Sequence, residues 1–138
     1  MADIRTAVQF SLDREGVYSN DANDRGQLTV YGISRYFNPD ADIWPLVDAL
    51  PHPLTTSAIK SNPAILDAAI SFYEEKFCKP LRIAEIVNQD VANDTLRQGI
   101  NGGLHTAIVQ MQQALGLPET GVFDNATLNI LNSVNNYA

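Results

Sequence analysis

The chain has 138 residues, of which 45% are apolar and 18% charged, and its formal net charge is −7 at pH 7. This length supports one compact domain and leaves no room for two independent cores. The nine lysines and arginines are scattered, which argues against nucleic acid as a partner, because that binding needs cations to neutralise phosphates. The single cysteine, Cys78, excludes an internal disulfide and is interpreted as a small buried hydrophobe.

The N-terminal segment carries charges at Asp3, Arg5 and Asp13 and has no uninterrupted apolar run. We therefore expect neither a signal peptide nor membrane insertion, and we expect synthesis in the cytoplasm. The first predicted element is a helix with Ile4, Val8 and Leu12 on one face, closed by a glycine at position 16. Glu15 then lies in the last turn, where a carboxylate gains nothing from the helix dipole, so its position hints at function.

A short β pattern follows this helix. The polar cluster at residues 19–26 lies between Val17 and Tyr18 on one side and the apolar residues from Leu28 to Ile33 on the other. This arrangement predicts a β-hairpin or three-stranded ribbon, which we expect to be the only β structure.

Helical signals dominate the rest of the chain. Asn62 is an N-cap candidate followed by Pro63 at the first helical position, and Pro80 ends this helix. The sequence thus predicts a mainly α-helical fold with a small β ribbon. Proline and polar residues before position 61 predict a boundary between an N-terminal lobe (1–60) and a helical C-terminal lobe (61–138), packed as one compact unit.

Four further helices are predicted after Pro80. The first lies near 83–91, and the second starts at Asn93 or Asp94 and ends at the glycine pair that follows Asn101. The last two are marked by an apolar stripe at helical spacing and by an aspartate cap. The stripe consists of Leu104, Ile108, Met111 and Leu115, and the cap is Asp124.

Glu15 and Asp24 can supply the two carboxyl groups that hydrolysis of a glycosidic bond requires. One carboxyl group protonates the leaving oxygen, while the other activates water or attacks the sugar. The two residues occupy a helix end and the following turn, so the chain can face them across a groove. Thr29 can hold a water molecule with its hydroxyl group. The alternative is that Asp21 and Asp24 are ordinary turn residues.

A metal site is the other use of this acidic segment. Asp21, Asn23 and Gly26 match three positions of an EF-hand loop, but Arg25 and Gly32 stand where oxygen ligands are required. The two histidines are isolated, and no zinc motif, nucleophile motif or phosphate-binding loop occurs. We therefore expect neither a metal nor a cofactor.

The segment REGVYSNDANDRGQLTVYGIS resembles the N-terminal signature of the glycoside hydrolase family 108 N-acetylmuramidases, whose pattern is close to EGGYVNDPxDPGGxTxYGIT. The segment INGGLHTAIVQMQQALGLPETGVFDNATLNIL resembles the predicted peptidoglycan-binding segment that usually accompanies it. The two segments occur in the right order and span nearly the whole chain. The resemblance implies a lysozyme-like helical fold that cleaves the β-1,4 bond between N-acetylmuramic acid and N-acetylglucosamine.

By this resemblance the catalytic glutamate falls on Glu15, the aspartate on Asp24 and the threonine before the YGI motif on Thr29. The implied roles are general acid for Glu15 and orientation or activation of water for Asp24 and Thr29. Because the acid must be protonated near neutral pH, we expect Glu15 to be buried against apolar neighbours such as Val17 or Tyr31.

Three further side chains, those of Tyr31, Tyr18 and Asn101, are predicted to bind substrate. Tyr31 and Tyr18 can stack on sugar rings, as can Tyr36 and Trp44, although aromatic residues of a small domain also serve as core or wall. Asn101 can reach the glycan, or it can simply belong to a helix terminus.

Val17 and Gln27 replace glycines of the family pattern, which leaves a second hypothesis open. It is a catalytically impaired, lysozyme-like module that binds cell wall or a protein partner as a structural component. A helical scaffold without glycan contact is a third. The favoured hypothesis is a monomeric enzyme whose partner is the glycan strand of peptidoglycan. Such an enzyme would reach the wall through holin-type release in phage lysis or as part of a virion.

Overall fold

The computed structural model describes residues 1–20 and 28–134. These residues are mainly α-helical with a small three-stranded antiparallel sheet near the N-terminus, which confirms the predicted fold class. They form two compact units. The sheet unit is Leu12–Phe72, and the helical unit combines Met1–Ser11 with Tyr73–Ala138. The lobe boundary proposed from the sequence stays a prediction.

Helix α1 (Ile4–Glu15) begins and ends through local hydrogen bonding and backbone geometry. At its start, the Asp3 carboxylate accepts hydrogen bonds from the Thr6 backbone N–H at 2.9 Å and from the Thr6 hydroxyl at 2.6 Å. Both bonds favour the charged carboxylate, and they lower the pKa of Asp3. At its end, Gly16 has φ of +79°, a conformation that glycine adopts without a steric penalty. The predicted helix end is confirmed.

The sheet contains β1 (Tyr18–Asn20), β2 (Leu28–Val30) and β3 (Ile33–Ser34) in that order. The two central residues of the β2–β3 connection, Tyr31 and Gly32, both have positive φ, at +50° and +77°. This is the requirement of a type I′ hairpin turn, whose twist matches that of the flanking strands. The Tyr-Gly pair of the YGI motif therefore makes the turn.

Three helices complete the sheet unit: α2 (Ile43–Asp48), α3 (Thr56–Lys60) and the main part of α4 (Pro63–Tyr73). The predicted Asn62 cap is confirmed, because its side-chain oxygen accepts a hydrogen bond from the Ala64 backbone N–H at 3.0 Å. The core of this unit is formed by apolar side chains from the sheet and all of its helices. They are Leu12, Val30, Tyr31, Ile33, Ile43, Trp44, Val47, Ile59, Ile65, Ala69 and Ile70.

In the helical unit, α4 is followed by a π-helical turn, η1 (Glu74–Cys78), and a 3-10 turn, η2 (Ile83–Glu85). Cys78 is only 1% exposed. Burial, with a smaller effect of the Glu74 charge, raises the pKa of the Cys78 thiol to about 12. A thiol with this pKa is not a nucleophile near neutral pH, so the interpretation of Cys78 as a buried hydrophobe is confirmed.

Two helix boundaries after η2 correct the sequence interpretation. No helix covers 83–91, and α5 runs over Gln89–Gly102 instead of starting at Asn93 or Asp94. The reason is a stronger cap upstream: Asn88 is extended, and its side chain accepts from the Val91 backbone N–H at 3.1 Å. Asn93 lies inside the helix, where its side-chain oxygen accepts from Gln89 at 2.8 Å.

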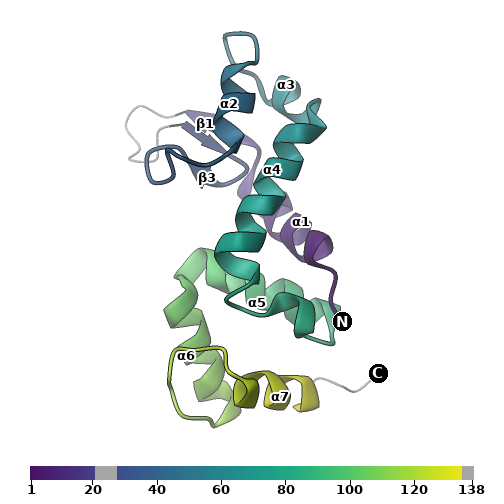
Figure 1. Ribbon diagram of the computed structural model, residues 1–138, viewed down its shortest axis with the longest axis vertical. Helices are drawn as coiled ribbons and strands as arrows, with labels where there is room; N and C mark the ends of the chain where they lie inside the picture. The colour runs from purple at the N-terminus through teal and green to yellow at the C-terminus, as the bar shows by residue number, and fades with distance from the viewer. Residues whose placement is uncertain (21–27, 135–138) are drawn as a thin grey trace. The chain divides into compact units, whose positions relative to one another are not determined.

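Helices α6 (Leu104–Leu115) and α7 (Asn125–Val134) follow α5 along the chain (Figure 1). Gly116 ends α6 with φ of +71°, and Asp124 caps α7 by accepting from the Thr127 backbone N–H at 2.9 Å, as predicted. One polar residue of α6, Gln112, is completely buried, which the sequence did not indicate. No helix among the described residues is long and apolar enough to cross a membrane.

Candidate active site

Glu15 is the last residue of α1, and its side chain is exposed. The chain turns at Gly16, where an added Cβ would meet nothing within 4 Å, and it enters β1 at Tyr18. The expected burial of Glu15 against apolar neighbours is therefore wrong. The helix end leaves the carboxyl group in water, which avoids the cost of burying a charge. Its position is open to a ligand that arrives from solvent.

Thr29 is the middle residue of β2 and is half-buried. Its register partners are Ser19 of β1 and Ser34 of β3. Residues directly opposite one another in antiparallel strands point to the same face of the sheet. Ser19, Thr29 and Ser34 therefore form a row of hydroxyl side chains across the sheet. Sequence reasoning found Thr29 but missed the two serines, because only the strand register brings them beside it.

Tyr31 and Tyr18 differ in exposure. Tyr31 is 7% exposed, its backbone N–H donates to the Val17 carbonyl at 2.8 Å, and burial raises the pKa of its phenol. Tyr18 is half-buried beside its register partner Val30. The burial of Tyr31 favours a place in the core or wall, while its contact with sugar stays a prediction.

Asp24 lies outside the described residues, and so do Asp21, Asn23 and Gly26 of the calcium-loop alternative. Within residues 1–20 and 28–134, no three histidine, cysteine, aspartate or glutamate side chains gather into a group that could hold a metal ion.

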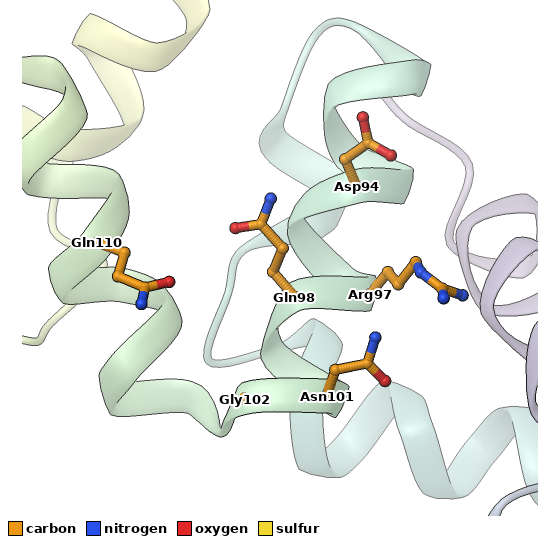
Figure 2. A pocket seen from close by; sticks show the side chains of 6 residues that line it. All are labelled: Asp94, Arg97, Gln98, Asn101, Gly102 and Gln110. Atoms are coloured by element: carbon orange, nitrogen blue, oxygen red, sulfur yellow. The ribbon is translucent and has the colours of Figure 1, made fainter.

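Asn101 lies in the helical unit, at a polar pocket of about 450 Å³. All the lining residues come from α5 and α6: Asp94, Arg97, Gln98, Asn101, Gly102 and Gln110. Gln98 and Gln110 extend into the space between the two helices, whereas the Arg97 guanidinium points away from Gln110 (Figure 2). A second hollow of about 270 Å³ shares Asp94, Gln98 and Gln110 and is otherwise more apolar. The pocket thus offers amide donors and acceptors to a polar ligand.

Among these lining residues, the sequence predicted only Asn101 to bind substrate. A signal for the others exists, because Asp94, Gln98 and Asn101 follow one another at helical spacing and so share one face of α5. That face becomes part of a pocket only when α6 lies against α5, which the helix periodicity does not predict.

The family model of glycosyl hydrolase 108 matches residues 8–103. The chain belongs to the glycosyl hydrolase 108 family. A second model, a peptidoglycan binding domain, matches residues 100–131. No curated protein sequence matches the chain. Glu15, Thr29 and the three-stranded sheet lie in the first match, and Asn101 lies where the two overlap.

Membership of glycosyl hydrolase 108 makes the protein a glycoside hydrolase, and the peptidoglycan binding match makes peptidoglycan its target polymer. The predicted family and the predicted hydrolase activity on peptidoglycan are confirmed at this level. Within the glycosyl hydrolase 108 match, the structure places an exposed acid at a helix end and a row of hydroxyl groups on the sheet that follows it.

Proposed function

We propose that the protein is an N-acetylmuramidase that cleaves the β-1,4 bond between N-acetylmuramic acid and N-acetylglucosamine, with Glu15 as the general acid. The observation that carries this proposal is the exposed carboxyl group at the end of α1, within the residues that match glycosyl hydrolase 108. A purely stabilising acid is disfavoured at a helix C-terminus. A proton donor, in contrast, must be reachable by the leaving oxygen.

In the proposed reaction Glu15 gives a proton to the glycosidic oxygen as the bond to the anomeric carbon breaks. Water adds to that carbon and loses its proton, which yields a new reducing end on N-acetylmuramic acid and a free 4-hydroxyl on N-acetylglucosamine. Asp24 and Thr29 are proposed to orient or activate the water. The role of Asp24 rests on the sequence resemblance, while Thr29 is supported by its place in the hydroxyl row.

The exposure of Glu15 in the free protein gives the substrate a further role. A glycan strand laid over the helix end would displace water from the carboxyl group and strengthen its interaction with the leaving oxygen. The proposed setting is phage-mediated lysis or entry, and it rests on the resemblance of the sequence to muramidases of phages and bacteria.

The test compares wild type with Glu15→Gln on purified peptidoglycan, using turbidity and release of reducing ends. The matched control is Asp42→Asn, which removes one exposed carboxylate of the same unit that makes no side-chain cap bond. We expect Glu15→Gln to lose at least about 100-fold in rate, the usual contribution of a general acid. Asp42→Asn should stay within about twofold of wild type, and both variants should keep the wild-type circular dichroism spectrum.

The identity of the bond is read from the products. Borohydride reduction before acid hydrolysis converts the new reducing sugar into its alditol, and muramitol is the expected product. Glucosaminitol would show a glucosaminidase and overturn the proposed bond. Full lytic activity of Glu15→Gln would remove Glu15 from its proposed role whatever the product.

A further inference from the structure

Beside the hydroxyl row, the turn at residues 34–38 exposes an aromatic pair. Tyr36 and Phe37 are 61% and 62% exposed, and their ring centroids lie 5.0 Å apart with the planes at 86°. Single exposed apolar side chains are common on protein surfaces, but two adjacent large rings at this exposure form an apolar patch, which is a candidate binding surface. We propose that Tyr36 and Phe37 form a platform for an N-acetylhexosamine ring of the glycan strand, with the face of one aromatic ring stacked on the sugar and the other ring standing nearly perpendicular beside it, an inference that rests on the proposed function.

The platform is rigid because the backbone beneath it is hydrogen-bonded at both ends. The Asn38 backbone N–H donates to the Ser34 carbonyl at 2.9 Å, and that of Phe37 donates to the Ser34 hydroxyl at 3.3 Å. The indole N–H of Trp44, which is buried in α2, donates to the Asn38 carbonyl at 2.7 Å. A turn held this way loses little backbone freedom on binding, so more of the contact energy is available for affinity.

The charges around the pair favour a neutral ligand. Arg35 donates to both carboxylate oxygens of Asp48, at 2.6 and 2.7 Å, and its guanidinium lies 5.1 Å from the Trp44 ring centroid. The cation of this turn is therefore already engaged, and the exposed acids Asp40 and Asp42 follow it. An anionic lipid headgroup would be repelled here. A pyranose, whose C–H face is apolar and whose hydroxyl groups are uncharged, suits the two rings.

The size and location of the pair also favour a sugar. Two aromatic rings at 61% and 62% exposure offer at most about 300 Å², which is well below the approximately 1,000 Å² that a specific protein interface requires. The turn begins at Ser34, the register partner of Thr29. The platform thus directly follows the last residue of the hydroxyl row along the chain, in the unit that carries Glu15.

The experiment measures binding of soluble N-acetylglucosamine oligomers by calorimetry, together with kcat and KM on soluble glycan strands. The variants are Tyr36→Ala/Phe37→Ala and the ring-keeping Tyr36→Phe. Val134→Ala, at an exposed apolar residue outside both family matches, is the control. We expect the double variant to weaken binding and raise KM by roughly tenfold, the size of one to two aromatic contacts. Its kcat should stay within about twofold, and Tyr36→Phe and Val134→Ala should bind like wild type.

A dissociation constant of the double variant within twofold of wild type would overturn the platform. The platform would also be overturned if the double variant kept its affinity for the oligomers but lost binding to phosphatidylglycerol vesicles, because this result would assign the pair to a lipid surface. Glu15→Gln separates this inference from the proposed function, because it should abolish cleavage while leaving oligomer affinity unchanged. If the wild-type protein showed no muramidase activity but Tyr36→Ala/Phe37→Ala still bound the oligomers more weakly, the sugar-binding platform would hold without the proposed function.

Discussion

Two irregular segments, the turn at residues 34–38 and the connection at 116–124, are held in place in opposite ways. The turn keeps its polar groups bonded at the base and leaves Tyr36 and Phe37 in solvent. The connection is held from inside by Gln112, whose amide is completely buried. Buried polar groups and exposed aromatic pairs are the exceptions to the usual distribution of side chains. The first indicates a structural requirement and the second a binding surface.

The largest expected effect on stability concerns the buried Gln112 and the connection that it holds. The two N–H groups of the Gln112 amide are shared among three acceptors at 3.0–3.1 Å, the Thr120 hydroxyl, the Val122 carbonyl and the Thr127 hydroxyl, and the amide oxygen accepts from the Gly121 N–H at 3.1 Å. Gln112→Ala removes these bonds and leaves buried partners unsatisfied. We expect it to lower the free energy of unfolding by about 2–4 kcal/mol in urea titrations.

The control for this change is Gln113→Ala, at the exposed neighbouring residue, which should alter stability by less than about 0.5 kcal/mol. Equal, small effects of both variants would contradict the view that Gln112 holds the connection. The unfolding midpoint of the Tyr36 and Phe37 variants should also match wild type, since neither ring is buried.

A smaller effect is expected from the backbone of the same connection. Gly121 has φ of +74°, and a Cβ placed there would collide with the imidazole of His105. His105 is exposed and can move aside, so the remaining cost of Gly121→Ala is mainly the left-handed backbone, about 1–2 kcal/mol. Gly102→Ala is the matched control, because its Cβ would meet nothing within 4 Å. The midpoint of thermal unfolding should fall for Gly121→Ala and stay at the wild-type value for Gly102→Ala.

Sequence reasoning succeeded where a single residue decides the local structure. Gly16 and Gly116 end helices because glycine adopts positive φ without a steric cost. Asn62 and Asp124 begin helices because their side-chain oxygens accept hydrogen bonds from the first turn. Sequence reasoning did not identify Asn88 as the cap of α5, because several asparagines and aspartates in that stretch have the same capping chemistry. Tertiary bonding to the N-terminal segment, where Gln89 accepts from the Asp3 N–H at 2.7 Å, accompanies the observed start.

The candidate site divides in the same way. The position of Glu15 at a helix end follows from the glycine after it, and the place of Thr29 in a strand follows from the apolar alternation. The exposure of Glu15 could not be predicted, because burial depends on what the rest of the chain brings to the helix end. The serines beside Thr29 and the polar pocket at Asn101 were missed because they arise from strand register and helix pairing.

The smallest predicted effect concerns the support beneath the exposed aromatic pair. Hydrogen bonding from Arg35 lowers the pKa of Asp48, so the folded state binds this proton less tightly than the unfolded chain does. The stabilisation is then fully present above the unfolded pKa of about 3.9 and is lost as the pH falls through the folded pKa. Because the Asp48 side chain is 53% exposed, solvent screening limits the contribution to below about 1 kcal/mol.

Asp48→Asn should therefore unfold at a slightly lower urea concentration than wild type at pH 7, and the difference should shrink as the pH falls through the lowered pKa of wild-type Asp48. Asp40→Asn, at an exposed acid of the following segment, is the control and should unfold at the wild-type urea concentration at pH 7. If loosening Arg35 also frees the turn at residues 34–38, Asp48→Asn should weaken binding of N-acetylglucosamine oligomers at pH 7 while both aromatic rings remain. Unchanged affinity in Asp48→Asn would show that the hydrogen bonds of Ser34 and Trp44 hold the platform without the ion pair.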